Sequence, residues 1–112
     1  MTKNQTVSLV SELQSYCFSV GASDISTDIK YSGSNINILI KSNYDKKYLD
    51  VLNEANSLLN PIIKNIGMEM YWELLGSSDG VDIQLDIIGQ LVSTADVVIE
   101  DSIFTMTIGV EM

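Results

Sequence analysis

Carboxylates are prominent among the groups in this chain that could do chemistry, with fifteen Asp and Glu residues in all. Asp79, Asp82 and Asp86 are spaced to share one face of a helix, and clustered carboxylates are ligands that Ca²⁺ or Mg²⁺ accepts. They lack the Asp-x-Asp-x-Asp-Gly order of a dedicated cation loop, so a solvated acidic face is the simpler interpretation. Asp24 and Asp28 share a strand face that we expect to meet solvent. We therefore expect no metal site and no cofactor.

Nucleophilic chemistry has one candidate, Cys17. The chain contains no histidine, which removes the commonest general base and any phospho-accepting histidine. Cys17 lies on the apolar side of a predicted helix, where a buried, inert thiol is the expected state. No pair of carboxylates can be placed face to face from the sequence, so we expect a protein that is not an enzyme.

A group of large side chains, Met68, Met70, Tyr71 and Trp72, has helical spacing. Methionines and aromatics in this pattern usually belong to a core, but they also form adaptable binding surfaces. Met68, Tyr71 and Trp72 are therefore candidate interaction residues, and both interpretations stay open.

Composition limits the remaining classes. The 112 residues are 46% hydrophobic and 19% charged, with a net charge of −9, which favours one folded domain over residues 1–112. Such a charge repels nucleic acid and anionic lipid. With one cysteine, no signal sequence and no apolar run long enough to span a bilayer, we expect a cytoplasmic protein without membrane insertion.

Periodicity predicts the elements of the first half. Apolar residues recur at helical spacing from about Lys3 to Val20, and Gly21 suits the helix stop. Residues 24–31 then alternate, which predicts a strand. Its expected core face consists of Ile25, Thr27, Ile29 and Tyr31. Residues 32–35 predict a hairpin turn into a second strand that carries Ile36, Ile38 and Ile40.

The apolar pattern in the second half of the chain is less regular. A helix should begin near Leu49, and Asn60-Pro61 should start a new short helix that ends at Gly67. A further helix is expected at residues 68–75. Residues 81–87 fit either a strand or a helix, and we favour a helix from about Asp82 to Thr94. Residues 97–100 and 103–110 predict a final hairpin, with Phe104, Met106, Ile108 and Val110 on its apolar face.

These elements predict an α+β fold, a four-stranded antiparallel sheet made of two hairpins with helices packed on one face. Residues 8–45 resemble the opening half of the histidine-kinase-like ATPase superfamily, which includes sensor kinases. The whole chain, with the stretch from Tyr71 to Leu74, is also similar to small bacterial proteins of clostridial type that are labelled as sensor histidine kinases.

The resemblance implies a nucleotide site whose key groups this chain does not carry. In the superfamily, a magnesium-binding asparagine follows a glutamate of the first helix by four residues, but here Glu12 is followed by Tyr16. After the second strand, Asp45 could stand for the adenine-reading aspartate of D-x-G-x-G, yet no glycine accompanies it. The only Asp-Gly pair, Asp79-Gly80, comes much later.

We therefore expect a non-catalytic regulatory domain of signal transduction, which acts as a homodimer or docks a protein partner. Self-association would use a sheet edge or the helix that bears Tyr71 and Trp72. The alternative is a module that binds a small ligand or ATP with magnesium, in a pocket near Asp45 or Asp79 and Gly80.

Overall fold

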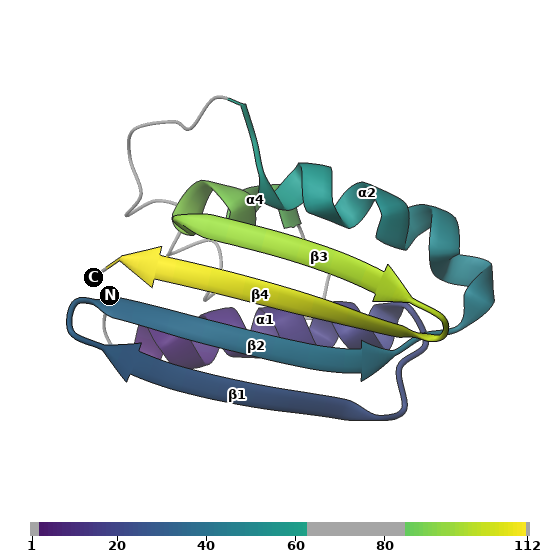
Figure 1. Ribbon diagram of the computed structural model, residues 1–112, viewed down its shortest axis with the longest axis horizontal. Helices are drawn as coiled ribbons and strands as arrows, with labels where there is room; N and C mark the ends of the chain where they lie inside the picture. Colours follow the sequence, from purple (N-terminus) through teal and green to yellow (C-terminus); the bar gives the residue numbers. More distant parts are fainter. Residues whose placement is uncertain (1–2, 63–84, 112) are drawn as a thin grey trace.

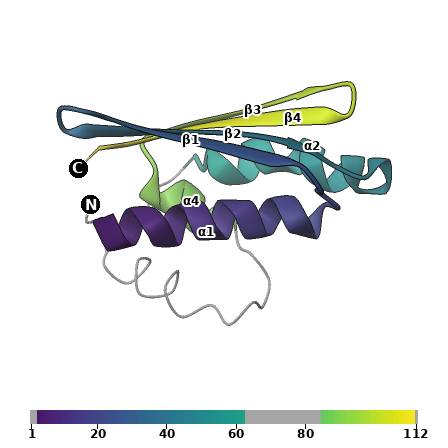
Figure 2. The same cartoon turned by 90° about the horizontal axis from the view of Figure 1, so that it is seen from below.

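A computed structural model describes residues 3–62 and 85–111 of the chain. Its α+β architecture confirms the predicted fold class: an open, four-stranded antiparallel sheet with helices on one face (Figures 1 and 2). The elements, in chain order, are α1 (Lys3–Ser19), β1 (Ile25–Ser32), β2 (Asn35–Asn43), the 3₁₀ turn η1 (Lys46–Tyr48), α2 (Leu49–Leu59), α4 (Leu85–Leu91), β3 (Thr94–Glu100) and β4 (Ile103–Glu111). The strands lie side by side in the order β1-β2-β4-β3.

Helix α1 forms where the sequence predicts it. Leu9 and Leu13 lie one helical turn apart and are fully buried, as is Cys17 one further turn along. The helix ends at Ser19, and Gly21 just beyond it has a φ of 86°, a left-handed conformation that other residues rarely adopt. Both the apolar stripe and the stop are thus set by local sequence.

The core lies between the helices and the two central strands. Ile38 of β2 pairs with Ile108 of β4, and both side chains are fully buried. The alternating apolar residues predicted for these strands are all buried: Ile36, Ile38, Ile40, Phe104, Met106, Ile108 and Val110. Because alternate side chains point to opposite faces, this pattern fixes which face receives the helices.

Both hairpins close through a two-residue turn that contains one positive φ. Gly33 has a φ of 61° in the first turn, and Asp101 has a φ of 53° in the second. Aspartate tolerates this conformation better than most side chains. The Tyr44 hydroxyl donates a hydrogen bond to the carbonyl oxygen of Asp101 at 2.7 Å, which ties the second turn to the end of β2.

The outer strand β1 departs from its predicted burial. Ile29 and Tyr31 were expected to meet the core, yet their side chains remain 40% and 53% exposed. They do lie on the side of the sheet that carries the helices, but α1 packs mainly against β2. The second half of β1 therefore lies at the margin of the helix layer, where the Tyr31 hydroxyl donates to the Thr6 Oγ1 atom of α1 at 3.5 Å but both side chains stay partly exposed. Sequence alternation does not reveal this partial cover.

The ambiguous segment is a helix where the structure describes it, since α4 covers Leu85–Leu91. The predicted end at Thr94 was wrong, because Thr94 already begins β3 and pairs with Gly109. The strand therefore starts three residues earlier than the predicted Val97. Thr94 and Ala95 can extend β3 because β4 is long enough to pair with them, a tertiary effect that local periodicity does not contain.

Helix α2 ends at Leu59 with Asn60 as its cap, as expected for a helix that precedes a proline. Other predictions lie outside the described residues. They include the short helix expected after Pro61, the helix at residues 68–75 and the exact start of the helix near Asp82.

Candidate functional site

One face of the sheet carries no helix among the described elements (Figure 2). Its side chains alternate with those of the core. Lys41 of β2, Thr105 of β4 and Val98 of β3 belong to it, and the exposed Leu39 adds to its apolar part. The face therefore mixes aliphatic, hydroxyl and charged groups, a composition found at protein interfaces as well as on ordinary surfaces.

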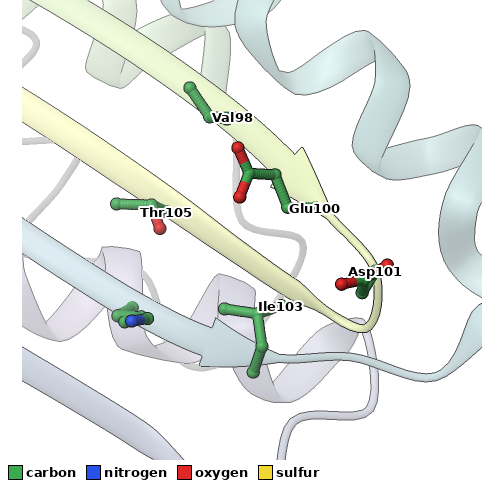
Figure 3. Close-up of a pocket in the computed structure, with 6 residues that line it drawn as sticks. Val98, Glu100, Asp101, Ile103 and Thr105 are labelled. Carbon is green, nitrogen blue, oxygen red and sulfur yellow. The ribbon is translucent and has the colours of Figure 1, made fainter.

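A shallow depression of about 450 Å³ lies on this face near the second hairpin turn (Figure 3). Its lining residues are Lys41, Val98, Glu100, Asp101, Ile103 and Thr105. The charged groups are one ammonium and two carboxylates, so the depression has a negative balance. It suits a cationic or zwitterionic group better than a polyphosphate, which the carboxylates would repel.

The outer edge of β3 is occupied by side chains of α2. The Asn56 Oδ1 atom accepts a hydrogen bond from the Val97 N–H at 3.1 Å. The Asn60 Nδ2 atom donates to the carbonyl oxygen of Ala95 at 3.0 Å, and also to the carbonyl oxygen of Asn56 at 2.8 Å. Two asparagines one helical turn apart thus satisfy main-chain groups that an edge strand leaves unpaired.

The outer edge of β1 differs. Ser32 pairs with Asn35 across the two-residue turn, so the even-numbered residues of β1 bond to β2, as the bond from Asn43 N to Asp24 O also indicates. Thr27, Ile29 and Tyr31 therefore turn their N–H and C=O groups outward. Among the described residues, no group bonds to them. We call these three residues the open edge.

Asp45 has a structural role in the part of the chain that is described. It caps η1, with its Oδ1 atom accepting from the Lys47 N–H at 3.1 Å, and its own N–H donates to the Val20 carbonyl oxygen at 2.9 Å. A Cβ atom on Gly21 would come within 2.7 Å of the Asp45 side chain, so the end of α1 is closely packed against this loop. Asp45 does not line the depression.

Tyr16 occupies the position that the ATPase resemblance assigns to an asparagine. Its side chain is buried, and its hydroxyl has no hydrogen-bond partner among the described residues. Burial, with smaller contributions from Cys17 and Glu54, raises the pKa of this phenol to about 12. A neutral phenol in the core cannot replace a compact amide ligand of magnesium.

Cys17 is buried, as predicted, and its surroundings oppose ionisation. Burial raises the pKa of the thiol to about 11, and a hydrogen bond with Ser42 offsets part of that shift. Since the thiolate is the reactive form, this cysteine is poorly suited to nucleophilic chemistry at neutral pH.

Several predicted site residues lie outside the described residues: Met68, Tyr71, Trp72, Asp79, Gly80 and Asp82. Within residues 3–62 and 85–111, no group of three or more Cys, Asp or Glu side chains is arranged to hold a metal ion. Asp28 is exposed and lies 3.8 Å from the Lys30 ammonium, a solvated pair on the helix-free face.

The sequence pattern did not predict that Asn56 and Asn60 bond to a strand edge, and it placed Asn60 only at the start of a helix at Pro61. Two asparagines at i and i+4 at the end of a helix are a weak signal, because a strand that begins 34 residues after Asn60 supplies their partners. The depression was also missed, although the residues of its face alternate with predicted core residues. The order of the strands, which brings Lys41 near Glu100, could not be read from the sequence.

The fold defines the chain as an α+β protein with an open antiparallel sheet. Searches with the sequence and the structure matched no protein-family model, no curated protein and no solved structure. None of the described helices has the length and apolar character needed to cross a membrane.

Proposed function

We propose that this chain is a non-catalytic interaction domain that acts by self-association or by docking a protein partner. The observation that carries the proposal is the open edge of β1, on which the Ile29 and Tyr31 side chains are partly exposed. An edge strand with unpaired main-chain groups and adjacent apolar side chains is a common template for a further strand.

The potential catalytic groups support a binding role over a chemical one. Cys17 is buried and has a raised pKa, and Tyr16 replaces the expected magnesium ligand within the core. Asp45 serves as a cap in a loop that holds η1. The resemblance to histidine-kinase-like ATPases remains part of this proposal, as a scaffold related in architecture without the groups that hold magnesium and nucleotide.

Light scattering on the purified chain, combined with calorimetric titration of ATP and magnesium, tests the proposal. We expect an oligomer, or a monomer that binds a protein partner, and no heat of nucleotide binding. A monomer that binds ATP tightly, or turns it over, would contradict it.

The depression near Lys41 favours one alternative, a small-ligand module. Lys41, Glu100 and Thr105 offer a cation, an anion and a hydroxyl within one concave patch. Thermal melting with ATP, magnesium, calcium or zwitterionic amino acids tests this function. A ligand at a hundred times its dissociation constant should stabilise the fold by about 2.7 kcal/mol. A compound that leaves the melting temperature unchanged would be excluded as a ligand.

A further inference from the structure

We infer that the open edge pairs with the same edge of a second copy, so that two sheets join antiparallel about a two-fold axis at Ile29. The inference rests on the proposed function and specifies its self-association route.

The two edges of the sheet differ in whether their outward main-chain groups are already bonded to described residues. The edge of β3 lies beside α2, and Asn56 and Asn60 already bond to Val97 and Ala95 (Figure 1). A strand added there would have to displace both asparagines. The edge of β1 has no such occupant among the described residues, so a new strand can bond to it without breaking existing bonds.

The charged residues on either side of Ile29 favour one register for the paired strands. In a two-fold pairing centred on Ile29, each Ile29 exchanges both main-chain bonds with its copy, and Thr27 of one chain pairs with Tyr31 of the other. On the helix-free face, Asp28 of one chain then lies opposite Lys30 of the other, twice. The sequence Asp28-Ile29-Lys30 is therefore complementary to itself in charge.

The two nearest registers on either side lose this complementarity. A shift that keeps the outward groups paired and centres on Asp28 places the two Asp28 carboxylates directly opposite each other, and one centred on Lys30 opposes the two ammonium groups. Like charges directly across a pair of strands are unfavourable, whereas opposite charges stabilise it. Within one chain Asp28 and Lys30 are exposed and 3.8 Å apart, so both side chains are free to reorient towards a partner.

Exposed apolar side chains of α1 lie on the side of the helix that faces β1. Val7 and Phe18 of α1 are 67% and 65% exposed. They lie at helical spacing from Gln14, whose Nε2 atom donates to the Thr27 Oγ1 atom at 2.9 Å, so this face of α1 is turned towards β1. A second copy at the open edge would cover Ile29 and Tyr31 and bring a second α1 alongside.

Charge variants test the register. Asp28→Lys makes the chain less negative overall and should weaken general repulsion between copies. It nevertheless places a lysine at position 28 of each chain opposite Lys30 of the other chain. Lys30→Asp likewise places an aspartate at position 30 of each chain opposite Asp28 of the other chain. We expect each variant to raise the dimer dissociation constant about tenfold or more, measured by sedimentation equilibrium up to millimolar protein.

Mixing the two variants provides the decisive measurement. An Asp28→Lys chain opposite a Lys30→Asp chain restores two opposite-charge pairs, so native mass spectrometry of an isotope-labelled mixture should show the heterodimer in excess over both homodimers. The double variant Asp28→Lys/Lys30→Asp should regain the dimer of the unmodified chain. Circular dichroism and thermal melting serve as controls for folding, since both side chains are exposed.

The outcomes separate this inference from the proposed function. If the unmodified chain is a dimer that both single variants leave unchanged, the β1 pairing is overturned and self-association uses another surface. If the unmodified chain stays monomeric at millimolar concentration, both the pairing and the self-association route are overturned. Homodimers that weaken without any preference for the heterodimer would overturn the register.

Discussion

The two edges of the sheet differ although each belongs to a similar hairpin. At the β3 edge, Asn56 and Asn60 of α2 bond to the outward main-chain groups, whereas at the β1 edge no described residue does so. The hairpins themselves do not explain the contrast, since both close through two-residue turns and both place an apolar face on the helices. The position of a helix relative to an edge therefore decides which strand remains available.

Side-chain burial also differs between the centre of the sheet and its β1 edge. Ile38 is fully buried on a central strand, whereas Ile29, on the same side of the sheet, is 40% exposed. Replacing Ile38 with alanine should lower the free energy of unfolding by about 2–5 kcal/mol, because the cavity is enclosed on all sides.

Ile29→Ala is the matched control for this prediction. It should cost less than about 1 kcal/mol when unfolding is measured by urea titration at low protein concentration, because water already reaches the side chain. Equal losses for the two variants would contradict the assignment of β1 as a partly uncovered edge.

Substitution by aspartate distinguishes the two asparagine contacts at the β3 edge, because Asn60 acts there as a donor and Asn56 as an acceptor. Asn60→Asp removes the amide donor that bonds to Ala95 and Asn56, and it places a carboxylate near two carbonyl oxygens. Since each hydrogen bond contributes about 0.5–1.5 kcal/mol net, we expect a loss of about 1–3 kcal/mol in the free energy of unfolding.

Asn56→Asp keeps the acceptor that faces the Val97 N–H and should change stability by less than about 0.5 kcal/mol. Chemical denaturation of both variants tests the pair of expectations. If Asn56→Asp proves the more damaging change, the proposed direction of donation at this edge is wrong.

Alkaline pH should lower the free energy of unfolding through two buried ionisable groups of α1. The thiol of Cys17 and the phenol of Tyr16 have pKa values raised from 9.0 and 10.0 to about 11 and about 12. The unfolded chain therefore loses these protons at lower pH than the folded chain does. The contribution of these two groups to the free energy of unfolding is complete below about pH 9 and is lost as the pH rises through the pKa values of the folded state.

We expect a decline of order 1–2 kcal/mol in the free energy of unfolding between about pH 9 and 11 from Cys17. Cys17→Ala should remove that part of the slope, measured by urea denaturation at several pH values, even though it also lowers stability at neutral pH. A slope that is the same in both proteins would show that the thiol is not responsible.

Much of the fold could be predicted because its signals are local. The alternation in β2 and β4, the apolar stripe of α1 and Gly21 at its end each depend on neighbours within a few residues. The candidate site was harder to predict. Asp45, the predicted ligand residue, caps η1 in the structure, and this contact depends on where the loop lies against the end of α1.

By itself, the sequence determined the class of the fold, the faces of its central strands and the burial of Cys17, because side-chain period and composition act locally. Only the tertiary structure decided that β2 and β4 lie in the middle, that α2 covers one edge and that Ile29 and Tyr31 remain uncovered at the other. These depend on pairing and packing between segments far apart in the chain. No local pattern specifies which strand becomes an open edge.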